Sequence, residues 1–222
     1  MRPVLSSVAE EFERTTGHKI IVSYAPAGAV MKRIQAGETA DMAFLSRPAI
    51  DQLVKQGKIV PDTANIMYSA VGVAVRAGAP KPDISSVEAL KRTLLAAKSI
   101  AYFDPAAGGS SGIHFARVLE RLGIAEEMKS KSKLVQGPTA EFAAKGEVEL
   151  AIQQVNELLA IPGIEVVGPL PPELQDPVAF TFAAGIFPNA QEPQAARALI
   201  KFLTSPALAK VDKSKGLEPA TR

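Results

Sequence analysis

The chain has 222 residues, a formal net charge of +2, 47% hydrophobic residues and 22% charged residues. These are the proportions of an ordinary globular protein, and no basic cluster of the kind that binds nucleic acid is present. The absence of cysteine excludes thiol catalysis, disulfide bonds and thiolate metal sites, and no apolar run approaches the about 18 residues that span a membrane.

The first third of the chain alternates between helix and strand patterns. Apolar residues at helical spacing from Val4 to Phe12 predict a helix that ends at Gly17. The rest of this series is predicted, in chain order, as a strand at 20–24, a turn at 25–29, a helix at 30–35, a strand at 42–45, a helix at 49–56 and a strand at 66–75. Short connections between alternating helices and strands indicate a parallel sheet covered by helices.

A Pro/Gly-rich segment at 76–82 interrupts the pattern, and a second alternating series follows it. It is predicted as helix 87–96, strand 99–103, helix 113–122, strand 133–135, helix 139–145, strand 150–153, helix 155–159 and strand 164–167. A second break at 168–172 precedes an apolar strand at 178–187 and helices at 194–203 and 206–212. The two breaks predict two lobes, residues 1–75 plus 181–222 and residues 76–180. This is the layout of a hinged clamshell that binds its ligand in a cleft at the carboxyl ends of both sheets.

The clearest chemical pattern is a glycine- and serine-rich turn that links strand 99–103 to helix 113–122. A strand, a small-residue loop and a helix N-terminus in this order form an anion site, because the first helical N–H groups lack internal partners and the helix dipole is positive there. A plain turn with a serine cap is the alternative. Similar small-residue turns follow other predicted strands, so we expect the ligand-binding residues to be Ala27, Gly28, Ser46, Ser110, Ser111, Gly112 and Gln154.

Residues that could carry covalent chemistry are sparse. His18 stands at a predicted strand start, where a surface position is expected, whereas His114 lies in the first turn of helix 113–122 and could reach a cleft. The sequence has no Gly-x-Ser-x-Gly elbow and no cluster with metal-ligand spacing, and the Gly/Ser loop lacks the lysine of a phosphate-binding P-loop. We therefore expect a binding protein without catalytic residues, metal or cofactor.

Several stretches, in their order and spacing, resemble periplasmic solute-binding proteins of the molybdate-binding type. They are residues 12–19, 25–29, 33–41, 104–105 with 112–113, 119–123, and 198–203 with 205–207, and the resemblance covers essentially the whole chain. It implies an α/β type II binding fold of two lobes, each a mixed, mostly parallel sheet flanked by helices, with two hinge crossings. It also implies a monomer that delivers a small anion to the permease of an ABC transporter, without inserting into the membrane.

Two positions depart from the pattern of the molybdate binders. The turn at 25–29 is Ala-Pro-Ala-Gly-Ala where those proteins are rich in serine, and Gln154 stands where they use a tyrosine. Each lost donor is worth about 1 kcal/mol or more in a buried site, which lowers the affinity for a tetrahedral oxyanion at least about tenfold. Gln154, Ser110 and Ser111 would instead suit a carboxylate or another small organic anion.

The start of the chain is a third departure. Members of the family begin with a strand and a serine-bearing turn, whereas Met1 is already at the first predicted helix. A late start, trimming or a true loss of this strand would each leave a gap in the first lobe. No leader is present in this numbering, so we expect a mature or trimmed periplasmic protein, with a cytoplasmic protein as the alternative.

Two other functions are alternatives to the capture of an anion for uptake. One is an enzyme on the same scaffold, an isomerase or lyase that acts on a small organic acid and uses His114 or Asp104 as its base. The other is a regulatory effector-binding domain, although no DNA-binding helix-turn-helix precedes it. The capture of a small anion, either an oxyanion such as molybdate or an organic carboxylate, is the function we expect.

Overall fold

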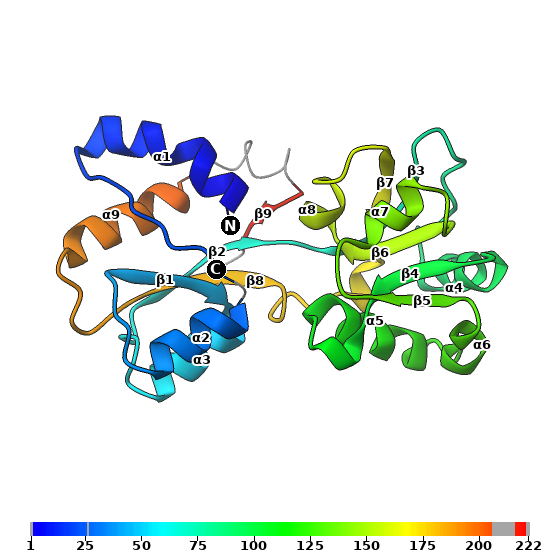
Figure 1. Ribbon diagram of the computed structural model, residues 1–222, viewed down its shortest axis with the longest axis horizontal. Helices are drawn as coiled ribbons and strands as arrows, with labels where there is room; N and C mark the ends of the chain where they lie inside the picture. Colours follow the sequence, from blue (N-terminus) through cyan, green and yellow to red (C-terminus); the bar gives the residue numbers. More distant parts are fainter. Residues whose placement is uncertain (1, 26, 206–215, 221–222) are drawn as a thin grey trace. The chain divides into compact units, whose positions relative to one another are not determined.

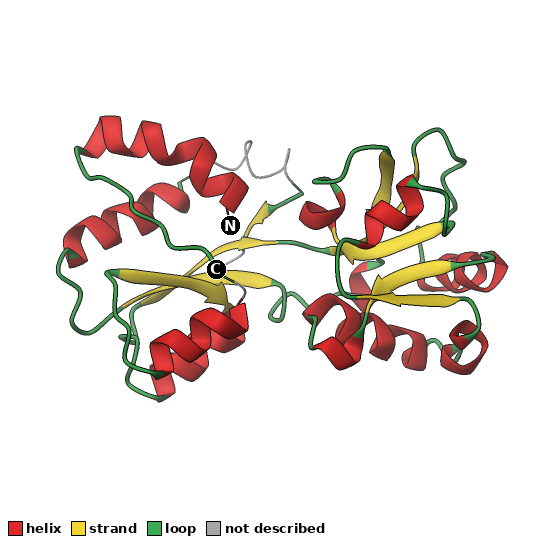
Figure 2. Ribbon diagram, viewed as in Figure 1, coloured by secondary structure: helices red, strands yellow, loops and turns green. Residues whose placement is uncertain are grey.

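The computed structural model describes residues 2–25, 27–205 and 216–220, and the chain divides into two compact units. Unit 1 comprises Met1–Tyr68 and Val178–Arg222, and unit 2 comprises Ser69–Pro177. Each unit contains one sheet with helices on both of its faces (Figure 2). The helix predicted at 206–212 lies outside the described residues. No helix within the described ranges is long and apolar enough to cross a membrane.

Unit 1 is built on a sheet of four strands in the order β1-β8-β2-β9. Helices α1 and α9 cover one face of this sheet and helices α2 and α3 cover the other (Figure 1). The elements are α1 (Arg2–Thr16), α2 (Ala27–Gln35), β1 (Met42–Ser46), α3 (Arg47–Lys55), β2 (Thr63–Tyr68), β8 (Thr181–Ile186), α9 (Pro193–Leu203) and β9 (Glu218–Pro219).

The two faces of the sheet in unit 1 have separate apolar cores. Phe12 of α1 and Leu199 of α9 pack with Ile66 of β2 in the first, and Ile34 of α2 packs with Leu53 of α3 in the second. Both cores arise from the amphipathic helical spacing that the sequence shows. Gly17 ends α1 with a φ of 73°, a left-handed conformation that glycine adopts without strain.

Unit 2 is built on a sheet of five strands in the order β5-β4-β6-β3-β7. Helices α7 and α8 pack on one face, where Ala140 and Leu158 contact Ala101 and Ala151, and α5 packs on the other, where Phe115 contacts Tyr102. The elements are β3 (Val71–Arg76), α4 (Val87–Ala96), β4 (Ile100–Phe103), η1 (Pro105–Ala107), α5 (Ser110–Arg121), α6 (Ala125–Lys129), β5 (Ser132–Val135), α7 (Thr139–Ala144), β6 (Leu150–Gln154), α8 (Val155–Leu158), β7 (Ile164–Pro169) and η2 (Pro172–Leu174).

The expected predominance of parallel pairing is wrong. In unit 2, β4 pairs in parallel with β5 and β6, but β3 is antiparallel to β6 and β7. In unit 1, β8 lies between β1 and β2 and is antiparallel to both. The alternation of helices and strands predicts parallel neighbours only for strands that follow one another, whereas β8 enters its sheet from a distant part of the chain.

The strand predicted at 66–75 is two strands in two different sheets. Ser69, between β2 and β3, is fully buried, and its hydroxyl donates a hydrogen bond of 2.6 Å to Asn156 Oδ1. This side-chain bond satisfies a polar group at the point where the chain leaves one sheet and enters the next. Because β3 pairs with β6 and β7, it belongs to unit 2, whereas the sequence prediction assigned residues up to 75 to the first lobe.

The strand predicted at 20–24 does not form. Its β-branched residues Ile20, Ile21 and Val22 lie in a segment without regular structure, and Ile21 is 90% exposed. Strand propensity requires a neighbouring strand to pack and bond with, and a cavity of about 600 Å³ lies between this segment and β1.

Candidate functional site

The turn between β4 and α5 is shaped by Asp104 and three glycines. The Asp104 carboxylate accepts a hydrogen bond of 3.0 Å from the backbone N–H of Ala106 and so begins the short helix η1. Gly108 follows with a φ of 80°, where a side chain would be strained. Gly109 is the N-cap of α5, which begins at Ser110, three residues earlier than predicted.

Gly109 and Gly112 bring the start of α5 against the end of β4. A Cβ atom built on Gly109 would enter the ring of Phe103, and one on Gly112 would enter its backbone carbonyl, far inside the 3.0 Å that real Cβ atoms keep. Glycine at these two positions thus lets the helix approach the strand closely. This contact determines where the first N–H groups of α5 lie.

The N-terminus of α5 has no side-chain cap. Among the described residues no side chain makes a capping hydrogen bond there, which disfavours the alternative of a plain turn with a serine cap. Helix geometry leaves the N–H groups of Ser110, Ser111 and Gly112 without partners inside the helix, and the dipole of this 12-residue helix is positive at this end. Ser110 is exposed and Ser111 is buried. The arrangement can bind an anion through two hydroxyl and several backbone donors.

Two other helices of unit 2, α7 and α8, also follow strands, and a side chain binds the first N–H group of α7. At α7, the side-chain oxygen of Gln153 accepts hydrogen bonds from the N–H and the hydroxyl of Thr139, at 2.9 and 3.1 Å. At α8, Gln154 is the N-cap and its side chain makes no capping hydrogen bond. Gln154 is buried, and its role in ligand binding stays a prediction.

The pKa of Glu157 is raised above its ordinary value of 4.5, chiefly because burial penalises the charged carboxylate; hydrogen bonds from Gln153 and from the N–H of Gln154 oppose this shift. The native state therefore holds this proton more tightly than the unfolded chain does. The resulting contribution to stability is fully present below the unfolded pKa and is lost as the pH rises through the folded pKa.

Glu157→Gln should remove this pH dependence. We expect the melting temperature of the variant minus that of the wild type to increase as the pH rises from about 4.5 toward neutrality, because only the wild type ionises. Differential scanning fluorimetry with an external dye measures the two melting temperatures across this pH range. The contributions of all other carboxylates are the same in both proteins and cancel in the difference. A difference that is constant with pH would contradict the assignment.

In unit 1 the predicted site residues lie at two helix starts. Ala27 and Gly28 are the exposed first residues of α2, and Ser46 ends β1 and is the N-cap of α3, again without a capping side-chain bond. Arg47 follows, and its guanidinium bonds Asp51 at 2.6 Å and the hydroxyl of Thr63 at 3.2 Å. The sequence predicts a turn at 46–47, but Arg47 was not counted among the expected ligand-binding residues, although an arginine directly after a strand and at a helix start is a signal for anion binding.

The residues considered as catalytic bases have structural bonds. His114 Nε2 lies 2.8 Å from the carbonyl oxygen of Leu174, so the imidazole ties α5 to the segment at η2. The Asp104 carboxylate stabilises the η1 turn. His18 is exposed, as the sequence predicts, and its ring stacks on Phe12. Within the described ranges, no group of three or more acidic or histidine side chains could hold a metal ion.

Comparison with known proteins identifies the family. The model of the bacterial extracellular solute-binding proteins matches residues 1–218, nearly the full chain. The chain belongs to this family. Among curated relatives, an aconitate isomerase from Pseudomonas sp. is 35% identical over 97% of this chain and 83% of its own length. The molybdate-binding protein ModA from Azotobacter vinelandii is 29% identical over 96% of this chain and 84% of its own length.

Solved structures of solute-binding proteins share the fold. The substrate-binding domain of a proposed molybdenum ABC transporter from Clostridium difficile superposes with a TM-score of 0.85 over 99% of this chain and 95% of that domain, at 16% identity. The solute-binding family, the resemblance to molybdate-binding proteins and the α/β type II binding fold inferred from the sequence are thereby confirmed.

Proposed function

We propose that this member of the solute-binding family captures a small organic anion that carries carboxylates, in the periplasm, and delivers it to the permease of an ABC transporter. The observation that supports the proposal is the N-terminus of α5, where Ser110, Ser111 and Gly112 present donors that no side chain in the described part of the chain caps. At the neighbouring helix α7, by contrast, the side chain of Gln153 accepts a hydrogen bond from the N–H of Thr139, which supports assigning the ligand to the donors of α5.

A carboxylate needs fewer donors than a tetrahedral oxyanion. In unit 1 the turn at 25–29 has no serine, and Ala27 and Gly28 offer only backbone N–H groups. The hydroxyl donors that the molybdate binders have in this turn are therefore missing, which favours a carboxylate. One curated relative is named for aconitate, which is a tricarboxylate, and this name supports the same ligand class.

The second candidate is an isomerase that acts on such an acid, and the identity of 35% to the aconitate isomerase favours it. Isomerisation by proton transfer needs a group that takes a proton from the ligand and returns it. The two side chains considered for this role, Asp104 and His114, hold a turn and a neighbouring segment. For that reason we rank binding without chemistry above catalysis.

A ligand screen tests the proposal. We expect cis- and trans-aconitate, citrate or a smaller carboxylate to raise the melting temperature, and molybdate, tungstate, sulfate and phosphate to have little effect. A ligand at 100 times its dissociation constant adds about 2.7 kcal/mol to the free energy of unfolding. A shift with molybdate alone would refute the carboxylate class, and no shift with any anion would refute anion capture.

The same samples separate binding from catalysis. Proton NMR of cis- or trans-aconitate incubated with the protein should show no interconversion if the protein only binds. Interconversion at a rate proportional to protein concentration would establish the isomerase instead. Heat-denatured protein provides the blank for the spontaneous reaction.

A further inference from the structure

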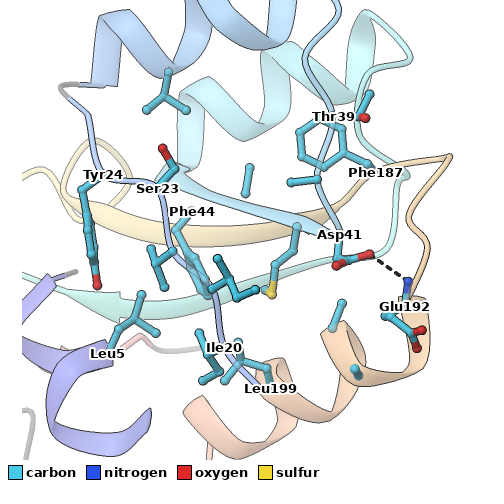
Figure 3. Close-up of a pocket in the computed structure, with 18 of the residues that line it drawn as sticks. Leu5, Ile20, Ser23, Tyr24, Thr39, Asp41, Phe44, Phe187, Glu192 and Leu199 are labelled. Carbon is cyan, nitrogen blue, oxygen red and sulfur yellow. Dashed lines mark hydrogen bonds between the residues drawn. The ribbon is translucent and has the colours of Figure 1, made fainter. Parts of the chain in front are cut away.

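A cavity of about 610 Å³ lies at one edge of the sheet of unit 2, where β4 and β6 begin and β3 ends. This volume is typical of small-molecule sites, which enclose about 300–1,000 Å³. The strands β4, β5 and β6 run parallel, so α5, α7 and α8, which follow them, start at the opposite edge. The cavity is therefore separate from the helix start proposed to bind the anion, and it is also distinct from the cavity beside β1 in unit 1 that Figure 3 shows.

Hydrogen bonds fix the loop that forms one wall of this cavity, residues 77–86. Glu165 of β7 accepts a bond of 3.1 Å from the N–H of Gly78 and pairs with Lys81 at 3.3 Å. Further along, the hydroxyl of Thr93 in α4 donates a bond of 2.7 Å to the carbonyl oxygen of Asp83. The loop is thus tied to β7 at its start and to α4 near its end. A ligand that enters such a preformed cavity has little of the protein to order.

The inside of the cavity is largely apolar. Val75, Ala97 and Val148 line it and are at most 6% exposed. Pro80 and Pro82 of the loop line it as well. None of these side chains can donate or accept a hydrogen bond. A ligand that fills the cavity must therefore have an apolar body.

Two cations line the same cavity. Arg76 is the last residue of β3, and its Nη1 would lie 3.4 Å from a Cβ atom built on Gly146, in the turn between α7 and β6. Lys98 follows the end of α4. Within the described ranges neither of these two side chains makes a hydrogen bond or an ion pair. The carboxylate of Glu149 accepts a bond of 2.8 Å from the backbone N–H of Lys98 and so already has a partner.

The C-terminus of α4 also contributes to the cavity, and the helix dipole is negative there. Lys131 offsets part of this charge, because its Nζ donates a bond of 2.5 Å to the carbonyl oxygen of Leu95. The N–H of Ala97 satisfies a second carbonyl, that of Thr93, at 2.9 Å. With these acceptors occupied, the unpaired guanidinium and ammonium determine the sign of the charge that the cavity attracts.

We propose that this cavity is a second binding site, which takes an amphipathic monocarboxylate, a molecule with one carboxylate and an apolar chain or ring as its body. The carboxylate pairs with Arg76 and Lys98, because a guanidinium and an ammonium both donate charge-assisted hydrogen bonds to it. The body packs against Val75, Ala97 and Val148. The site does not rest on the proposed function, since its residues belong neither to α5 nor to the turn before it.

Three eight-carbon probes test the charge and the body of the ligand separately. Octanoate has the proposed carboxylate, octanamide replaces it with a neutral amide, and octylamine carries a positive charge on the same chain. We expect titrations followed by proton NMR of each probe to show saturable binding of octanoate and at least fivefold weaker binding of the other two. Absence of saturable octanoate binding would overturn the site, and equal binding of octanoate and octanamide would overturn its anionic class.

Hydrogen exchange with octanoate locates the site. Binding should slow the exchange of the backbone amides at 76–79, 93–99 and 146–150, and leave those at 110–112 and 20–24 unchanged. Protection at 110–112 without protection around the cavity would assign octanoate to the start of α5 and overturn the proposal. Protection confined to 20–24, a segment that lines the cavity in unit 1, would overturn it as well.

Matched charge variants identify the head-group contacts. Arg76→Gln and Lys98→Gln should each weaken octanoate at least fivefold and leave the melting temperature unchanged, because neither cation has a partner within the described ranges. Arg92→Gln is the control, since Arg92 is exposed on α4 outside the lining of the cavity, and it should change the affinity less than twofold. Equal losses in all three variants would trace the effect to net charge and contradict the assignment.

Ala96→Phe tests the cavity itself. Ala96 is an exposed residue of its lining, so a larger side chain there can fill the space without disturbing the core. We expect octanoate binding to fall at least tenfold, with the fold intact by circular dichroism. Undiminished affinity would overturn the proposal, and the Arg76 variant decides the question if this one does not fold.

Discussion

Replacing Gly112 with alanine is expected to destabilise unit 2 by about 1–3 kcal/mol and to displace the N-terminus of α5. An added Cβ would collide with the backbone carbonyl of Phe103, a group at the end of β4 that cannot move aside as a flexible side chain could. The packing of Phe115 against Tyr102 should loosen with the helix. Urea unfolding, with hydrogen exchange over residues 110–121, measures both effects.

Gly28→Ala is the matched control for this substitution. Gly28 also lies in the first turn of a helix, but a Cβ there would meet nothing within 4 Å. We expect it to leave stability unchanged or to raise it by about 0.4–1 kcal/mol, because alanine restricts the unfolded chain. Similar losses for the two variants would show that the close approach of α5 to Phe103 is not what requires glycine.

Ser110→Asp should separate the stability of the fold from its affinity for anions. A carboxylate in the first turn of α5 is favourable with respect to the helix dipole by about 0.3–1 kcal/mol, so the folded protein should be as stable as the wild type or slightly more so. The same charge occupies the place of a bound anion and repels it. We expect the affinity for the carboxylate ligand to fall about 10–100-fold in isothermal titration calorimetry.

Ser86→Asp is the control for a charge at a helix start of unit 2. Ser86 is the N-cap of α4 and accepts a hydrogen bond of 3.1 Å from the N–H of Ala89, a role that aspartate also fills. Its effect on ligand affinity should be less than twofold. If Ser110→Asp left the affinity unchanged, the anion would bind elsewhere. If both variants lost affinity equally, the loss would come from the change in net charge and not from the position of Ser110.

The local elements could be predicted because their apolar residues have one clear period. Helix α4 was predicted at its observed bounds, and the strands at β1, β4 and β5 were placed to within a residue. Pairing was predicted less well, because β8 takes its neighbours β1 and β2 from a distant part of the sequence. The segment at 20–24 has the residues of a strand, but without a neighbouring strand it has no ladder to form.

The candidate site was predicted in part for similar reasons. The Gly/Ser turn predicts a helix start that can bind an anion, and in the structure this start has no side-chain cap. Whether other starts are open depends on side chains from distant parts of the chain, such as the bond from Thr139 to Gln153. Such tertiary contacts close α7 and engage Arg47 with Thr63, and no local pattern shows them.

The position of β8 also sets the order in which the polypeptide can mature during its synthesis. Unit 2 is one uninterrupted segment, whereas the sheet of unit 1 needs residues 181–186 to join β1 to β2. At about 5–20 residues per second, a ribosome needs roughly 6–24 s to proceed from the end of β2 to the end of β8. During that delay β1 and β2 lack their shared neighbour. Unit 2 is therefore complete in sequence before the sheet of unit 1 can form.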